Sequence, residues 1–127
     1  MEGHRLGDEA ILNNNDKNKL KIMEQMYNSS IKYAYKCKSY KQMFTPYYWA
    51  SRYFMKSNKK EKAVKYSILT IENAERYCPD SRQSYIDKLY CCLKYLKKND
   101  RNNWKNFIKK YRKNSKNACL RKAIKDL

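Results

Sequence analysis

Glycine and proline are almost absent from this chain of 127 residues, and their scarcity restricts the folds open to it. The two glycines are Gly3 and Gly7, and the two prolines are Pro46 and Pro79. Glycine is the usual residue where the backbone needs a positive φ, as in tight hairpin turns and phosphate-binding loops. A chain without it has few ways to build β-turns. The sequence therefore predicts an all-α protein, a single-domain antiparallel bundle of five or six helices with short connections.

Apolar side chains recur every three or four residues over most of the chain, which is the spacing of one helix face. Residues 1–15 are polar, so we expect a flexible N-terminal segment there and a helical domain over residues 16–127. The predicted helices span residues 16–44, 46–56, 59–78, 81–98 and 101–113, with a short last helix after them. The first of these has a bend or break at Ser29-Ser30 or between Lys36 and Ser39, and Asn99-Asp100 is another break.

Residues that favour helix starts precede several of these segments. The expected N-terminal caps are Asp16 for the first helix, Thr45 before Pro46, Asn58 with Glu61, Asp80 with Gln83, and Asn114-Ser115.

Small residues are spaced along two neighbouring predicted helices so that the helix backbones can approach closely. The first helix carries Tyr47, Ala50-Ser51 and Phe54, and the second carries Ala63, Ser67 and Thr70. This pattern resembles the helical hairpin of tetratricopeptide repeats (TPR-like). Residues 47–98 are also similar to the three-helix microtubule-interacting-and-transport (MIT) domain. Both resemblances imply a helical protein–protein interaction module. The repeat does not recur downstream, where Lys88 and Lys97 occupy positions that need an aromatic residue and an alanine.

Candidates for catalysis or metal binding are few. The one histidine, His4, lies in the predicted N-terminal segment. Glu72 and Glu75 lie three residues apart, but Lys65 and Arg76 beside them indicate a solvated, charge-balanced face. The cysteines form no CxxC pair, and the usual nucleotide-binding and metalloprotease motifs are missing. We therefore expect a non-enzymatic protein without a cofactor or a metal ion.

The cysteines and the chain start bear on the compartment. An odd number of cysteines without paired spacing predicts reduced, buried thiols and a cytoplasmic protein, with the nucleus as the alternative. The five are Cys37, Cys78, Cys91, Cys92 and Cys119. The sequence contains no apolar run near the ~20 residues that a membrane span needs. Its polar start is unlike a secretory signal.

Positive charge is concentrated toward the C-terminus. The net charge is +18, and only Asp100 and Asp126 oppose the 14 Lys and Arg residues from Lys88 onward. Such a field attracts polyanions. Lys outnumbers Arg 23 to 7, which favours phosphates or diffuse acidic surfaces over base-specific DNA recognition. Richness in Lys, Asn, Tyr and Ile is also what AT-rich coding yields, so composition and a partner both stay open as the cause.

The expected partner is a protein with an acidic or amphipathic helical segment, bound in a groove between residues 46–56, 59–78 and 81–98. In this hypothesis Tyr48 and Trp49 supply apolar anchors, while Lys94, Lys97 and Lys98 steer acidic side chains. The alternatives are RNA or another nucleic acid, as in a ribonucleoprotein, and an anionic membrane or a larger assembly. Nucleic acid would bind the basic surface of residues 88–125, and the membrane or assembly would bind the helix of residues 101–113. The basic residues of that helix are Arg101, Lys105, Lys109, Lys110, Arg112 and Lys113.

Overall fold

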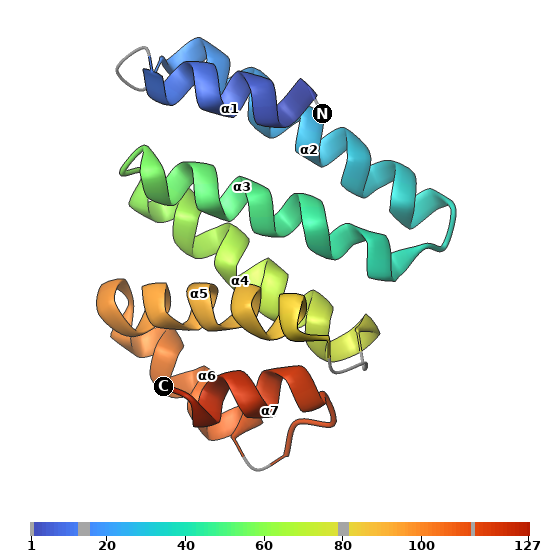
Figure 1. Cartoon of the computed structure of the whole chain (residues 1–127), viewed down its shortest axis with the longest axis vertical. Coiled ribbons are helices and arrows are strands. Elements are labelled where there is room, and N and C mark those ends of the chain that lie inside the picture. Colours follow the sequence, from blue (N-terminus) through green and yellow to red (C-terminus); the bar gives the residue numbers. More distant parts are fainter. Residues whose placement is uncertain (1, 13–15, 79–81, 113) are drawn as a thin grey trace.

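The protein is an array of antiparallel helices. The computed structural model describes residues 2–12, 16–78, 82–112 and 114–127, and these hold seven α-helices, one 3₁₀-helix and no strand, which confirms the all-α prediction. The elements are α1 (Glu2–Leu12), α2 (Lys17–Lys36), η1 (Tyr40–Met43), α3 (Phe44–Lys56), α4 (Lys60–Tyr77), α5 (Gln83–Asn99), α6 (Arg101–Tyr111) and α7 (Ala118–Lys125). They are stacked in chain order, from α1 and α2 at one end to α6 and α7 at the other (Figure 1).

The first helix corrects the sequence analysis, which expected a flexible segment over residues 1–15. Residues 2–12 form α1, and its buried residues are Gly3, Leu6, Gly7 and Ala10. The glycines face two aromatic rings. A Cβ atom on Gly3 would lie 2.9 Å from Cζ of Tyr27, and one on Gly7 would lie 2.7 Å from Cγ of Tyr53. The glycines therefore serve close helix packing and not a turn. Residues 13–15 of the expected segment lie outside the described residues.

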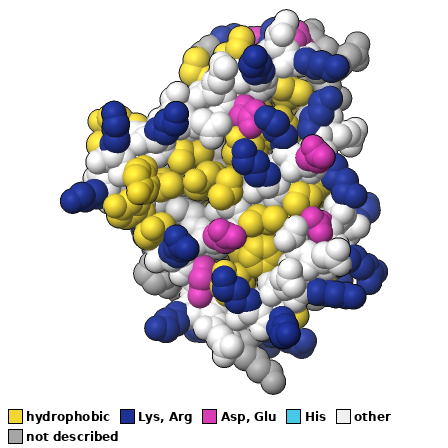
Figure 2. All heavy atoms as spheres, turned by 180° about the vertical axis from the view of Figure 1, so that it is seen from behind, with side chains coloured by type: hydrophobic (Ala, Val, Ile, Leu, Met, Phe, Trp, Pro, Cys, Tyr) yellow, Lys and Arg dark blue, Asp and Glu magenta, His cyan; other side chains and the backbone are white. Residues whose placement is uncertain are grey.

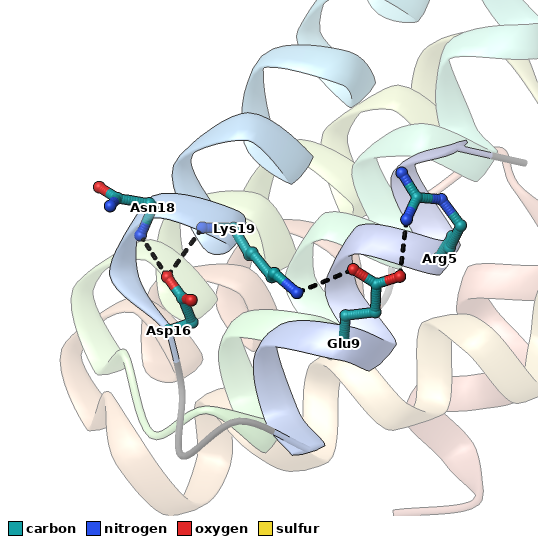
Figure 3. A network of polar contacts seen from close by, with 5 residues as sticks. All are labelled: Arg5, Glu9, Asp16, Asn18 and Lys19. Carbon is teal, nitrogen blue, oxygen red and sulfur yellow. Dashed lines mark hydrogen bonds and ion pairs between the residues drawn. The ribbon is translucent and has the colours of Figure 1, made fainter.

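Polar contacts also fasten α1 to α2 (Figure 3). The carboxylate of Glu9 accepts hydrogen bonds from Arg5 at 2.6 Å and from Lys19 of α2 at 2.9 Å. Asp16 caps α2, because its Oδ1 accepts from the backbone N–H groups of Asn18 and Lys19. The expected cap of this helix is thus confirmed, and its carboxylate lies beside the residue that binds Glu9.

The predicted helix 16–44 breaks between Lys36 and Ser39, one of the two expected places. Lys38 takes a left-handed φ of 56° there, and η1 follows.

The next two helix starts differ from prediction. Helix α3 begins at Phe44, so Thr45 lies inside the helix and is not its cap. Asn58 and Glu61 form no capping box. Asn58 turns the chain with a φ of 59°, and the N-cap residue of α4, Lys59, makes no side-chain capping bond.

Two later caps lie nearer the C-terminus. Asp100 begins α6 by accepting from the backbone N–H of Asn103, which agrees with the predicted break. Asn117, and not Asn114-Ser115, caps α7. The expected cap at Asp80 and the helix end at Pro79 lie outside the described residues.

Two main groups of buried side chains hold the array together. One joins α1, α2, α3 and the start of α4, and the other joins Phe44 to α4, α5, α6 and α7. The small residues that carry the hairpin resemblance are buried: Ala50, Ser51, Ala63, Ser67 and Thr70. Ser51 also meets α5, where its Oγ lies 3.8 Å from Sγ of Cys92. Burial raises the pKa of the Cys92 thiol to about 12, so it is an unreactive part of the core.

Two further observations concern the cysteines and the bilayer. The thiols of Cys78, Cys92 and Cys119 are buried, as expected, whereas Cys91 is half-buried and Cys37 is exposed. Within the described residues, none of the helices combines the length and apolar character needed to cross a membrane.

Candidate functional site

A concave site lies where the C-terminal halves of α3 and α5 meet the start of α4. Its volume is about 520 Å³, within the range of typical ligand pockets. Four cationic side chains line it, namely Arg52, Lys60, Lys94 and Lys98. The other lining residues are Met55, Asn58, Cys91, Tyr95 and Asn99. We call this site the basic hollow.

Helical spacing places these side chains together. On α5, Cys91, Lys94, Tyr95 and Lys98 follow one another by three, one and three residues, so they share one face of the helix. Arg52 approaches from α3. The left-handed turn at Asn58 then brings the start of α4, with Lys60, to the same place. The N-terminus of α4 has no side-chain cap, so the positive end of its helix dipole adds to the field.

Over the part of the chain that the structure describes, no ion pair is shown between a cation of the basic hollow and a carboxylate. The half-buried Arg52 directs Nη1 to Sγ of Cys91 at 3.1 Å and to Sδ of Met55 at 3.9 Å. The ion pairs shown among the described residues involve Arg5, Lys19 and Lys62, and none involves Arg52, Lys60, Lys94 or Lys98. Among the described residues, the site thus gathers four positive charges that no ion pair shown here neutralises.

The positive charge of the basic hollow affects the pKa of one acidic residue, Asp100. Hydrogen bonds from Asn103 lower the pKa of its carboxyl, and nearby Lys60 adds a smaller effect in the same direction. Its carboxylate is occupied as the cap of α6, since it accepts from the Asn103 backbone at 3.2 Å and from the Asn103 side chain at 2.7 Å. A ligand carboxylate would therefore not have to displace an existing ion pair.

The predicted partner-binding residues separate into different surroundings. Lys94 and Lys98 line the basic hollow, whereas Nζ of Lys97 lies 5.8 Å from the centre of the Trp104 ring. Tyr48 is half-buried, with Nζ of Lys88 5.4 Å above its ring. Burial, helped by neighbouring Cys91, raises the pKa of the Tyr48 phenol to about 12, so it stays neutral.

Trp49, the other predicted apolar anchor, is half-buried and does not belong to the lining of the basic hollow. Its ring centre lies 4.6 Å from that of His4, because α1 packs over this part of α3. The sequence analysis placed His4 in a flexible segment and so could not anticipate the contact. Arg52 and Lys60 were likewise missed, since their role depends on which faces of α3, α4 and α5 meet.

The basic C-terminal surface is exposed as predicted. Arg101, Lys105, Lys109 and Arg112 recur at steps of four, four and three residues along α6, and Lys110 is exposed beside them. Lys113 lies outside the described residues. On the opposite side of α6, Phe107 and Tyr111 are buried and Trp104 is half-buried. The apolar side of α6 therefore packs against the core.

Of the two carboxylates on α4, Glu72 and Glu75, the second has a structural role. Glu72 is exposed, while Glu75 accepts hydrogen bonds from the Ser115 hydroxyl and from the backbone N–H of Lys116. Glu75 thus ties α4 to the connection before α7. Among the described residues, no three His, Cys, Asp or Glu side chains gather where they could hold a metal ion.

Comparisons of the chain with protein-family models, with curated proteins and with solved structures found no match. The TPR-like and MIT-like resemblances therefore stay predictions, and the functional argument rests on geometry and charge.

Proposed function

We propose that this chain is a non-enzymatic helical adaptor that binds an acidic helical segment of another protein in the basic hollow. The observation that supports this most is the convergence of four cations on one concave site, where Nη1 of Arg52 is directed at two sulfur atoms, those of Met55 and Cys91. A guanidinium group favours two parallel hydrogen bonds to a carboxylate. Holding like charges together costs free energy, and a partner's carboxylates would relieve that cost.

The other walls of the hollow favour an amphipathic segment. Met55 and Tyr95 offer apolar surface between the cations, and a methionine side chain adapts to different shapes. A helix with acidic residues three or four apart and an apolar residue between them would match both features.

Binding of a designed peptide tests this proposal. The probe is a fluorescein-labelled peptide of about nine residues, held helical by a side-chain cross-link because so short a free peptide is not helical in water, with Glu at i, i+3 and i+4 beside one Leu. Reversing two charges of the hollow, Lys94→Glu with Lys98→Glu, should weaken binding at least about tenfold. The control reverses two exposed charges of α7, Lys122→Glu with Lys125→Glu, so both variants change the net charge equally. Equal loss in both variants would show diffuse attraction and would reject the hollow as the site.

Nucleic acid is the second candidate ligand, favoured by the exposed cations on α6. If RNA binds there, log Kobs should fall with log salt by roughly 0.7 per phosphate contact. Lys105→Glu with Lys109→Glu should then reduce binding, while Lys94→Glu with Lys98→Glu should not. A membrane-inserted α6 has less support, because Phe107 already lies in the core.

A further inference from the structure

A second hollow lies on the other side of the connection between α3 and α4. Its volume is about 460 Å³. Its lining residues come from residues 17–28 of α2 and from residues 54–62: Lys17, Leu20, Lys21, Glu24, Gln25, Asn28, Phe54, Lys59 and Lys62. Lys59 lines this second hollow and the next residue, Lys60, lines the basic hollow. One short turn therefore separates the two sites.

Charge in the second hollow is only partly balanced. Glu24 pairs with Lys62 and accepts a hydrogen bond from the Tyr66 hydroxyl at 2.6 Å. Although burial opposes it, these hydrogen bonds lower the pKa of Glu24 and keep the carboxylate ionised. Glu24 thus compensates Lys62. No ion pair shown among the described residues involves the remaining three lysines of this hollow, Lys17, Lys21 and Lys59.

The second hollow, like the basic hollow, has apolar side chains in its lining. Leu20 and Phe54 form part of its lining, and the Phe54 ring is held by stacking on Tyr66 at a centroid distance of 5.7 Å. Lysine side chains add their methylene stems to such a wall while their ammonium groups stay in water. The second hollow therefore suits an apolar side chain that is flanked by carboxylates.

The two hollows belong to one basic edge of the molecule. Figure 1 places the start of α2, the connection from α3 to α4 and the end of α5 on the same side. In the reverse view of Figure 2 that side appears on the right, and dark blue Lys and Arg side chains follow it over most of its length. The turn itself contributes Lys56, Lys59, Lys60 and Lys62 against the single acid Glu61.

We infer that the acidic partner helix continues across this turn and occupies both hollows. Its carboxylates would meet Arg52, Lys94 and Lys98 at one end and Lys21 and Lys59 at the other. An apolar side chain near the second end would lie against Leu20 and Phe54. This inference rests on the proposed function, and it adds the length of the partner segment and its pattern: acidic residues throughout and an apolar anchor toward one end.

The test compares two peptides on the full chain. The short peptide is the nine-residue probe described above. The long peptide has about 18 residues, with Glu spaced along one face and a Leu near one terminus. The basic-hollow variant is Lys94→Glu with Lys98→Glu, the second-hollow variant is Lys21→Glu with Lys59→Glu, and Lys122→Glu with Lys125→Glu is the control. Far-UV circular dichroism checks that each variant folds.

We expect the second-hollow variant to bind the long peptide at least about tenfold more weakly than the native chain does, and to bind the short peptide with unchanged affinity. Replacing the peptide's Leu by Gln should weaken the long peptide on the native chain but not on the second-hollow variant. The methyl resonances of Leu20 should shift only with the long peptide. The basic-hollow variant should weaken both peptides.

Three results would contradict the inference in distinguishable ways. If the second-hollow variant binds the long peptide as tightly as the native chain but the basic-hollow variant binds it more weakly, the proposed function is kept and the extension to two hollows is wrong. If neither variant differs from the α7 control, the proposed function fails as well. If a scrambled peptide of the same composition binds equally well, the edge attracts polyanions in general and not a patterned helix.

Discussion

Replacing Gly7 by alanine tests the packing of α1 more directly than any other change. The added Cβ would lie 2.7 Å from Cγ and Cδ1 of the Tyr53 ring and 2.8 Å from Cδ2. Carbon atoms in contact normally lie about 3.5–4.0 Å apart, so α1 or the ring must move by roughly 1 Å. The ring is not free to do so, because the Tyr53 hydroxyl donates to Asp8 at 2.9 Å and to the His4 carbonyl at 3.2 Å.

The magnitude follows from two opposing effects. Overpacking a buried site costs about 1–3 kcal/mol. Alanine in place of a helical glycine gains about 1 kcal/mol, and Gly7 has no positive φ that an alanine would strain. We therefore expect Gly7→Ala to lower the free energy of unfolding by about 1 kcal/mol. If α1 were flexible or exposed, Gly7→Ala would instead raise the free energy of unfolding by about 1 kcal/mol. The sign of the change therefore shows whether α1 packs against Tyr53.

Urea unfolding followed by far-UV circular dichroism measures the effect, and Trp49 fluorescence reports on the contact with α1. The control is the same substitution in a Tyr53→Ala background, where the clashing ring is gone. There Gly7→Ala should stabilise the protein, which gives a coupling energy of about 2 kcal/mol between the two positions. Stabilisation by Gly7→Ala in both backgrounds would refute the close approach of α1 to Tyr53.

Two further predictions concern buried polar groups. Burial lowers the pKa of His4 below its usual 6.5, so His4 binds a proton more readily in the unfolded chain than in the folded one. The free energy of unfolding should therefore be constant above about pH 7 and should decrease as the pH falls below about 6.5. In urea titrations between about pH 7.5 and 5, His4→Gln should flatten that fall, and an unchanged fall would contradict the assignment. The buried Asn117 donates to the carbonyls of Ala74 and Cys78 and accepts from the backbone N–H of Leu120 at 2.9 Å. Asn117→Ala should cost about 2–4 kcal/mol, because it leaves these groups unpaired, and a cost below about 1 kcal/mol in thermal or urea unfolding would argue against this link.

Local signals predicted much of the helical pattern. The breaks at Lys36–Ser39 and at Asp100 were predicted from residues that stop or cap a helix through their own side chain or backbone. Such signals act within one turn, so they do not need the rest of the fold. The caps expected at Thr45 and Asn58 failed because neighbouring residues could also begin the helix, and packing chose among them.

The basic hollow could be predicted only in part. Lys94 and Lys98 were candidates because they share one face of a helix with a strongly basic end. Arg52 and Lys60 come from other helices, and nothing in their local sequence marks them as neighbours of α5. Lys97 and Trp49 fall outside the lining of the basic hollow for the same reason, since a helix pattern shows which residues share a face but not what that face meets.

The sequence by itself determined that this chain is helical, basic and built from short connections, because backbone preference and apolar spacing are local properties. The tertiary structure decided that residues 2–12 belong to the core. Their buried stripe consists of glycines and alanine as well as leucine, which carries little hydrophobic signal, and it is stabilised only when Tyr27 and Tyr53 are present to receive it. It also decided where charge converges, because mutual repulsion among lysines is set by distance in space and not by order along the chain.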